Sequence, residues 1–356
     1  MEKVRIEDVA RIAKVSRATV SRVINGSFLV EVDTKERVRR AMERVGYVPS
    51  LRRPGPKPKL GRTPQLENGT IALIIIGATS HLLQEPIMIS VIDKLQMACR
   101  ARQLNLLLDQ MSSVKDIPHC VHSCQMDGAI LMVAERLDSQ REAIARLAEI
   151  LPCVQLFTPG HPVDTVDHAT TNDVAVGAMA YHALAELGCR QFVAVSANHD
   201  FHEALLVRGR AFLDRAQDQG FSTVSFAKMM SHGRAERMWP SPLSVFEQIA
   251  EVAAAVRQMA ATSAGPVGVF LTLEDYALEL HHALCREHLL QDGLVYLVVA
   301  GATQHYVGGL VPRPVLIDLC FQEIICTSVD RLIYRALNLP SDRITLMVAP
   351  KLMDCA

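Results

Sequence analysis

The stretch that most constrains the fold of this 356-residue chain runs from Val4 to Tyr47 and is predicted to form three short helices. The first carries an apolar stripe formed by Val9, Ile12 and Ala13. A turn of three residues leads to the second helix, for which Ser16 is a favourable N-cap. The third helix opens at Asp33-Thr34 and turns four apolar side chains inward, those of Val38, Ala41, Met42 and Val45. Two helices joined by so short a turn are typical of a helix-turn-helix domain.

The second predicted helix has an apolar side and a basic, hydroxyl-rich side. Val20, Val23 and Ile24 lie on the apolar side, and Asn25-Gly26 supplies a stop. The opposite side carries Arg17, Ala18, Ser21, Arg22 and Asn25. A face of this width and chemistry fits the major groove of double-stranded DNA.

The charge of the chain is divided between a basic N-terminal part and an acidic remainder. Residues 1–63 carry a net charge of +9 and the rest carry −10, although the whole chain sums to −1. A basic head on an acidic body indicates a nucleic-acid-binding module joined to a domain with another task.

Three segments of the head, Ile6–Asn25, Thr34–Val38 and Gly46–Pro49, resemble the DNA-binding headpiece of the lactose-repressor (LacI/GalR) family. The resemblance covers about the first fifty residues and departs at Lys14, where the family usually has Gly or Asn. A left-handed Lys at that position would cost on the order of 1–2 kcal/mol. The resemblance implies a bacterial transcriptional regulator of repressor type, which acts as a homodimer on a near-palindromic operator.

The side chains of the helix-turn-helix are expected to divide between bases and phosphates. We expect bases to be contacted by Arg17, Ala18 and Arg22. We expect phosphates to be held by Ser16, Thr19, Ser21, Asn25 and Thr34. Because one recognition helix reads only a few base pairs, specificity requires a dimer on two half-sites.

A basic, Pro-rich linker is predicted over residues 49–69, between a DNA-binding head at 1–48 and a body at 70–356. A continuous helix is excluded there by Pro54, Pro56, Pro58 and Pro64. The family usually has a hinge helix at this place with a Leu in the minor groove, and only Leu51 is available for that role. The linker instead resembles an AT-hook-like arm that would enter a narrow A·T minor groove with Arg52, Arg53, Lys57 and Lys59. A stiff basic spacer that only attracts phosphates is the open alternative.

The body alternates between buried strands and amphipathic helices, which implies parallel sheets covered on both faces. One set of elements begins with the strand Ile71–Ile76, and a second begins with the helix Val174–Leu187. So many strands favour two Rossmann-like lobes over a single sheet. The last elements are predicted to cross back between the lobes, and they are Arg313–Asp318, Gln322–Leu337 and Ile344–Val348.

The body also resembles the family, whose two lobes are of periplasmic-binding-protein type and bind a small effector in a cleft. The matching segments are Asp173–Gly177, Ala183–Val193, Arg208–Phe212 and Glu274-Asp275. Thr303 stands where a family member often has the carboxylate that clamps sugar hydroxyls, and Leu319 replaces a common Gln. The resemblance implies dimerisation through the body and an effector that is a sugar or a sugar derivative, although aromatic residues are only 5% of the chain.

Candidate effector contacts follow from the rule that ligands of open α/β sheets meet the carboxyl ends of strands. In both lobes together we expect these contacts from Ser80, His81, Asp109, Arg208, Glu274, Asp275 and Thr303. Strand ends also point to Gln110, Glu135, Asn198 and Asp200. Two alternatives stay open, because Asp173 and Asp200 could cap helices and Arg208 could pair with a carboxylate within its lobe.

Nothing in the sequence calls for a cofactor or a metal ion. His119-Cys120-Val-His122-Ser-Cys124 offers four soft ligands, but one short helix cannot direct all four at one point, so buried thiols are the better interpretation. His281-His282 is expected to lie on a helix surface. The nine scattered cysteines, the absence of a signal peptide and the lack of a membrane-length apolar run favour a cytoplasmic protein with free thiols.

Two function classes are alternatives to a ligand-gated regulator. An enzyme is disfavoured because no GxGxxG follows the first strand of the body, and no Walker loop or Gly-x-Ser-x-Gly elbow occurs. A regulator gated by a protein partner, or acting without an effector, remains an alternative because the usual sugar-clamping residues are depleted.

Overall fold

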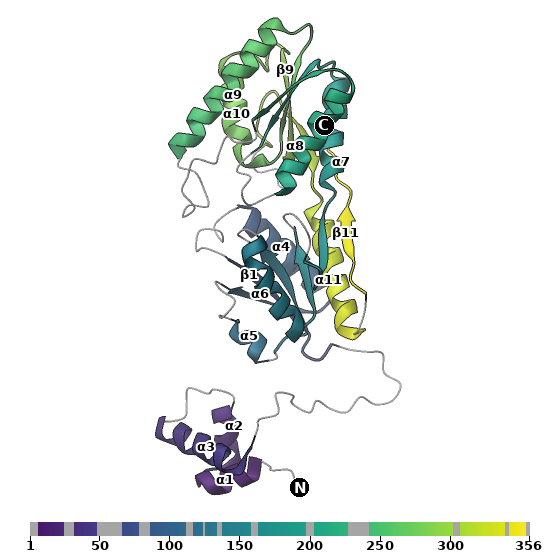
Figure 1. Ribbon diagram of the computed structural model, residues 1–356. Coiled ribbons are helices and arrows are strands. Elements are labelled where there is room, and N and C mark those ends of the chain that lie inside the picture. Colours follow the sequence, from purple (N-terminus) through teal and green to yellow (C-terminus); the bar gives the residue numbers. More distant parts are fainter. Residues whose placement is uncertain are drawn as a thin grey trace. The chain divides into compact units, whose positions relative to one another are not determined.

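The computed structural model describes most of the chain in twelve segments (Figure 1). These are residues 6–24, 32–47, 66–77, 86–111, 117–123, 125–133, 137–157, 163–196, 203–226, 242–301, 307–338 and 342–353. The chain divides into two compact units, Met1–Thr63 with His119–Gln125, and Pro64–Pro118 with Met126–Ala356. We call the three helices at the start of the first unit the head and the two sheets of the second unit the lobes, and describe each by itself.

The head consists of α1 (Ile6–Ala13), α2 (Arg17–Ile24) and α3 (Val32–Val45), as predicted. Lys14 turns the chain between α1 and α2 with a left-handed φ of 53°. Its small core consists of Val9, Ala10, Ala13, Val20, Val38 and Ala41. Ile12 was expected in the core but is 41% exposed, because α1 turns only its Val9, Ala10 and Ala13 side toward the other helices.

The first lobe is a six-stranded sheet in the order β11-β5-β4-β3-β1-β2, whose neighbouring strands are all parallel. In chain order its elements are β1 (Thr70–Ile76), α4 (Pro86–Ala101), β2 (Asn105–Met111), β3 (Gly128–Val133), α6 (Leu137–Ile150), β4 (Cys153–Leu156) and β5 (Asp167–Thr171). The short helix α5 (His119–His122), which follows β2 in the chain, is grouped with the first unit. The run of apolar residues in β1 is buried from Ile71 to Ile76, as expected of a parallel strand covered on both faces.

The second lobe is a six-stranded sheet in the order β12-β10-β9-β8-β6-β7, parallel except for the antiparallel pair β10–β12. Its elements up to the last crossing are α7 (Asp173–Glu186), β6 (Gln191–Val195), α8 (Glu203–Asp218), β7 (Ser222–Phe226), α9 (Pro242–Thr262), β8 (Val267–Leu271), the 3₁₀ helix η2 (Glu274–Tyr276), α10 (Ala277–Arg286), β9 (Val295–Gly301) and β10 (Val315–Asp318). The two sheets confirm the prediction of two Rossmann-like lobes.

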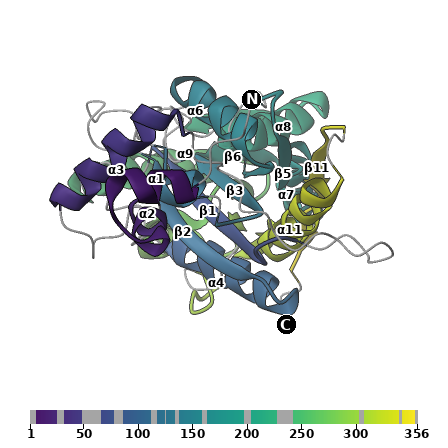
Figure 2. The ribbon, with the colours of Figure 1, turned by 90° about the horizontal axis from the view of Figure 1, so that it is seen from below.

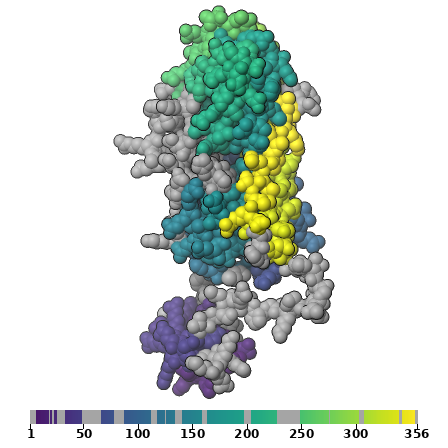
Figure 3. Space-filling model, turned by 45° about the vertical axis from the view of Figure 1, so that its right-hand side comes forward, coloured from purple at the N-terminus to yellow at the C-terminus, as the bar shows by residue number. Residues whose placement is uncertain are grey.

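The chain passes between the lobes at three places, after β5, after β10 and after β11. The closing elements are α11 (Phe321–Leu337), β11 (Thr345–Val348) and β12 (Lys351–Leu352), and α11 runs beside β5 and β11 (Figure 2). Where two of the crossings meet, Thr171 Oγ1 donates a hydrogen bond to the Leu319 carbonyl oxygen at 3.0 Å. The C-terminal segment, yellow in Figure 3, lies at the surface. These crossings confirm the expectation that the last elements return between the lobes.

A buried carboxylate ties the C-terminal elements to the first lobe. Asp167, at the start of β5, is fully buried and accepts hydrogen bonds from Arg331 Nε at 2.8 Å and Arg335 Nη1 at 3.3 Å. It also accepts the backbone N–H of Ile344, just before β11, at 2.7 Å. One side chain therefore fixes β5, α11 and the entry to β11 against one another. The strand β5 was not predicted from the sequence.

The residue after this carboxylate is a buried histidine that should make the protein less stable in acid. The Nε2–H of His168 donates to the Val163 carbonyl oxygen at 3.0 Å, and burial lowers the pKa of His168 below its usual 6.5. As the pH falls, the imidazole of His168 is therefore protonated in the unfolded chain before it is protonated in the folded protein, so folding stability is lost below about pH 6.5.

In urea unfolding at about pH 7.5 and about pH 5.5, His168→Gln should lose less stability on acidification than the parent protein. The exposed His282 serves as control, since His282→Gln should lose as much as the parent, and equal losses in all three proteins would contradict the assignment.

The structure corrects two of the sequence-based expectations. His281 is buried on the inner side of α10 rather than on the helix surface, and its Nε2–H donates to the Pro312 carbonyl oxygen at 2.8 Å. Asp173 does not cap α7, because Asn172 is the N-cap and its side chain accepts from the Ala175 N–H at 3.1 Å. None of the helices in the parts of the chain described above is both long enough and apolar enough to span a membrane.

Candidate DNA-binding and effector sites

The start of α2 presents polar side chains in a defined arrangement. The backbone N–H of Thr19 donates to Ser16 Oγ at 3.0 Å, so Ser16 caps α2, and the two hydroxyl oxygens lie 2.8 Å apart. The guanidinium of Arg17 lies 3.2 Å from a Glu7 carboxylate oxygen, and both side chains are more than half exposed. Because such a surface ion pair contributes little, Arg17 can leave Glu7 for a negatively charged ligand at small cost.

The other predicted DNA contacts divide into those on described backbone and those outside it. Ala18, Ser21 and Arg22 lie on α2, although the structure describes only their backbone, and Thr34 lies half-buried on α3. Outside the described residues lie Asn25, Arg52, Arg53, Lys57 and Lys59. The division between base and phosphate contacts therefore stays a prediction.

Two strands of the second lobe form a topological switch point. From β6 the chain turns to β7 on one side, and through α9 it then returns to β8 on the other side. The crevice at the carboxyl ends of such strands is the usual ligand site of an open α/β sheet. The residues that follow β6 and β8 directly are Ser196 and Thr272, both of which are buried.

Arg208 on α8 lies at this switch point and is 6% exposed. Its Nε donates to Asp173 Oδ1 at 2.7 Å, and its Nη1 donates to the Thr272 carbonyl oxygen at 3.0 Å. Burial raises the pKa of Asp173, while the Arg208 charge acts in the opposite direction. The expected alternative, a pairing of Arg208 with a carboxylate of its own lobe, is thus present. Arg208 Nη2 makes no hydrogen bond to a described residue.

A second carboxylate lies at the same edge of the sheet. Glu274 is 3% exposed and packs against Gly301, where a Cβ atom would come within 2.7 Å of the Glu274 carboxyl carbon. The Thr272 hydroxyl is buried and has no hydrogen-bond partner among the described residues. Arg208, Thr272 and Glu274 therefore place a cation, an unused hydroxyl and a carboxylate at one end of β8 and β9.

The structure brings together only part of the predicted effector set. Arg208 and Glu274 lie at the edge just described, while Asp109 is half-buried on the edge strand β2 of the first lobe. Asp275 lies in η2 with only its backbone described, and outside the described residues lie Ser80, His81 and Thr303. Ser196 and Thr272 were missed by the sequence reasoning, although a small hydroxyl residue directly after a buried strand could have marked both.

The His/Cys motif shows no sign of a metal site within the described residues. His119, Cys120 and His122 lie in or beside the short helix α5, and no group of three or more His, Cys, Asp or Glu side chains in the described part of the chain could hold a metal ion. Cys124 lies outside that part.

Comparison with known proteins yields one family and several relatives. The model of bacterial regulatory proteins of the lacI family matches residues 5–50. The ribose operon repressor of Haemophilus influenzae is 29% identical over 202 residues, which are 54% of this chain and 54% of that one. The HTH-type transcriptional regulator CelR of Thermobifida fusca is 28% identical over 224 residues, which are 58% of this chain and 62% of that one. The chain thus matches about half to three-fifths of the length of these relatives.

Among solved structures, the lac repressor dimer bound to operator and the anti-inducer ONPF matches with a TM-score of 0.58 at 18% identity, covering 99% of this chain and 98% of that one. Residues 5–50 of this chain form a head of the lacI type. The left-handed backbone of Lys14 lies within this matched segment, in the turn between α1 and α2. The two lobes of the chain have the periplasmic-binding-protein-like fold that the sequence predicted.

Proposed function

We propose that this chain is a LacI-family, sequence-specific DNA-binding transcriptional regulator of repressor type. The observation that carries the proposal is the helix-turn-helix head, in which a capped α2 presents Ser16, Arg17 and Thr19 within a segment that matches the family model. Both curated relatives described above are named as a repressor or a regulator, and neither is named as an enzyme. We infer a cytoplasmic protein that needs no cofactor.

Arg22→Ala tests base reading by α2. If the guanidinium binds a guanine edge, the variant should lose roughly 1–3 kcal/mol of affinity for the operator and accept other bases at one position of the site. The operator is first obtained by selecting bound sequences from a random DNA pool, and affinity is then measured on the selected site and on random duplex. Equal losses on both duplexes would show that Arg22 contacts only phosphate.

We propose that the protein acts as a homodimer through the body. Three large apolar side chains are exposed on neighbouring elements of the first lobe, where Ile89 on α4 is 58% exposed, Met97 on α4 is 57% exposed and Leu108 on the edge strand β2 is 47% exposed. Leu278 on α10 is 42% exposed in the second lobe. The relative whose structure matches was solved as a dimer on its operator. Burying these side chains in a twofold interface would remove apolar surface from water and place two α2 helices on two half-sites.

We propose further that a small polar molecule, of the sugar or sugar-derivative class, regulates the protein from the switch point of the second lobe. The donors and acceptors there suit hydroxyl groups: Arg208 Nη2, the Glu274 carboxylate, and the Thr272 hydroxyl, which has no partner among the described residues. Ser80, His81, Asp109, Asp275 and Thr303 stay predicted contacts. The basic arm of residues 49–69 stays a proposal in both of its forms, a minor-groove arm or a charged spacer.

Arg208→Ala tests the coupling of this site to the head. Ligand and operator affinities must be reciprocally linked, so the variant should bind DNA normally and lose the effect of the ligand on DNA binding. Arg210, exposed on the same helix, is the matched control, and Arg210→Ala should respond like the parent protein. DNA binding is titrated with and without a sugar that shifts it for the parent protein. A variant that unfolds would show that the pairing of Arg208 with Asp173 is structural and that the site assignment fails.

A further inference from the structure

A basic hollow lies between α1 and α3 of the head, apart from the residues proposed to meet DNA. Its volume is about 260 Å³. The apolar lining comes from Ile12, Ala13 and Ala41. The charged lining comes from Lys14, Arg37, Arg40 and Arg44. Neither an acidic residue nor any residue of α2 is part of the lining.

The charges of the hollow are largely uncompensated. Arg40 Nε lies 3.3 Å from a Glu36 carboxylate oxygen in an exposed pair, which is worth little. Lys14, Arg37 and Arg44 have no ion-pair partner within the described residues of the head. Lys14 holds its charge there at the conformational cost of a left-handed backbone. Concentrated positive charge on a folded surface favours a negatively charged partner.

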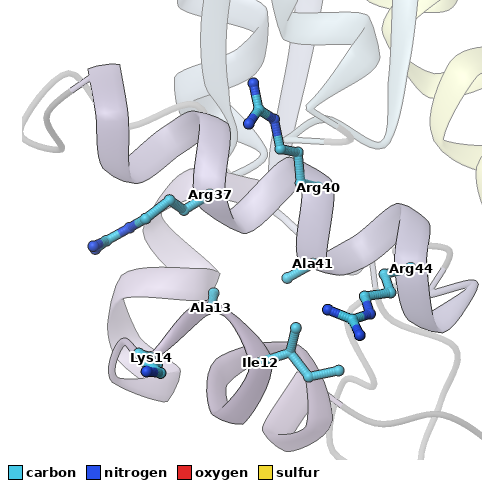
Figure 4. A pocket seen from close by; sticks show the side chains of 7 residues that line it. All are labelled: Ile12, Ala13, Lys14, Arg37, Arg40, Ala41 and Arg44. Atoms are coloured by element: carbon cyan, nitrogen blue, oxygen red, sulfur yellow. The ribbon is translucent and has the colours of Figure 1, made fainter.

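The floor of the hollow is apolar and in part exposed. Ala13 and Ala41 are buried, while Ile12 is 41% exposed. Figure 4 shows Ile12 from α1 and Arg44 from α3 on either side of the hollow, and Arg37 and Arg40 extending outward from its rim. An occupant that only carried charge would leave this apolar surface in water. An occupant with a bulky apolar side chain would cover it.

We propose that this hollow docks an acidic segment of a partner protein, in which one or two apolar side chains lie on Ile12, Ala13 and Ala41 while flanking carboxylates pair with Arg37 and Arg44. Arginine is suited to this role because its guanidinium meets a carboxylate through two parallel hydrogen bonds. DNA phosphate offers the charge but no apolar group for the floor, so the duplex is the less complete fit. The role of this docking rests on the proposed function, because a partner bound here would be brought to the operator.

The test measures fluorescence anisotropy of a labelled peptide of about twelve residues, rich in Asp and Glu with two central Leu residues three positions apart, added to the full-length protein. We expect binding that weakens about tenfold in Arg37→Ser/Arg44→Ser and in Ile12→Ser. Arg39, exposed on α3 but outside the hollow, is the matched control, and Arg39→Ser should bind the peptide like the parent. A peptide with Gly in place of both Leu residues should bind clearly more weakly.

Four results would overturn the proposal. They are no binding of the Leu-containing peptide, equal binding of the Gly-containing peptide, an equal loss in Arg39→Ser, and a loss of random-duplex affinity in Arg37→Ser/Arg44→Ser that matches its loss of peptide affinity. The last result would make the hollow a phosphate site. A protein that binds the peptide as expected but selects no DNA sequence would leave the docking surface standing and refute only the proposed function.

Discussion

Replacing Asp167 with asparagine should lower the free energy of unfolding by about 3–5 kcal/mol. The amide would keep the shape of the side chain but leave Arg331 and Arg335 without their shared counter-charge, and both guanidiniums are at most 12% exposed. Removing one partner of a buried ion pair strands the other charge in a medium of low polarity, which is why the expected loss is large. Urea unfolding monitored by circular dichroism measures it.

An exposed ion pair of α11, the helix that carries Arg331 and Arg335, supplies the control for this experiment. Asp330 is 63% exposed and holds Arg102 through two hydrogen bonds, to Arg102 Nε at 2.6 Å and to Nη2 at 2.7 Å. Because exposed pairs contribute about 0–1 kcal/mol, Asp330→Asn should unfold nearly like the parent protein. Comparable losses in the two variants would mean that the buried position of Asp167 is not what makes it stabilising.

Gly177→Ala should lower stability by about 3 kcal/mol, at the upper end of the cost of overpacking. Gly177 lies in the middle of α7, where α8 comes so close that an added methyl group would collide with backbone atoms. Its Cβ would lie 2.7 Å from the Phe212 nitrogen and 2.9 Å from the Ala211 Cβ, and would overlap the Arg208 carbonyl oxygen. The backbone of α8 can make room for the methyl group only if the whole helix moves, and this helix carries Arg208.

The sign of this effect distinguishes packing from helix propensity. On propensity alone, Ala in a helix interior would gain about 1 kcal/mol over Gly, so a more stable Gly177→Ala protein would contradict the close approach of α7 and α8. Gly309 provides the control, since a Cβ there would meet no atom within 4 Å. Gly309→Ala should stay within about 0.5 kcal/mol of the parent protein. The unfolding midpoints of the three proteins in urea decide the matter.

Much of the candidate DNA-binding surface could be predicted from the sequence because its determinants are local. The Ser16 cap, the stripe through Val9 and Ala13 and the inward face of α3 each depend on residues only a few positions apart. Helical spacing and capping are properties of such short segments, so they can be recognised without knowing the rest of the fold. The exposed Ile12 was the exception, since its exposure depends on how α1 meets its neighbours.

The candidate effector site could be predicted only as an edge of a sheet. The strand-end rule predicted contacts from Glu274 and, on the adjoining helix, from Arg208, and the structure places both at that edge of the second lobe. Their contact with an effector stays a prediction. The sequence could not show that Asp173, which lies 35 positions before Arg208, would take its Nε, or that Glu274 would pack on Gly301. These neighbours meet only once α7, α8 and β9 are packed, and the packing also leaves the Thr272 hydroxyl without a partner in the described part of the lobe.

The sequence by itself determined the helical head, the two alternating α/β lobes and the return of the last elements between them, because each follows from local periodicity and buried apolar runs. Only the tertiary structure decided that the polar segment Asp167–Thr171 is a strand. Its apolar content is too low to predict one, and it becomes a strand because Arg331 and Arg335, more than 160 positions later, neutralise Asp167 while β4 and β11 supply backbone partners. A contact between residues so far apart produces no repeating pattern in the sequence, so this strand can be recognised only in the folded structure.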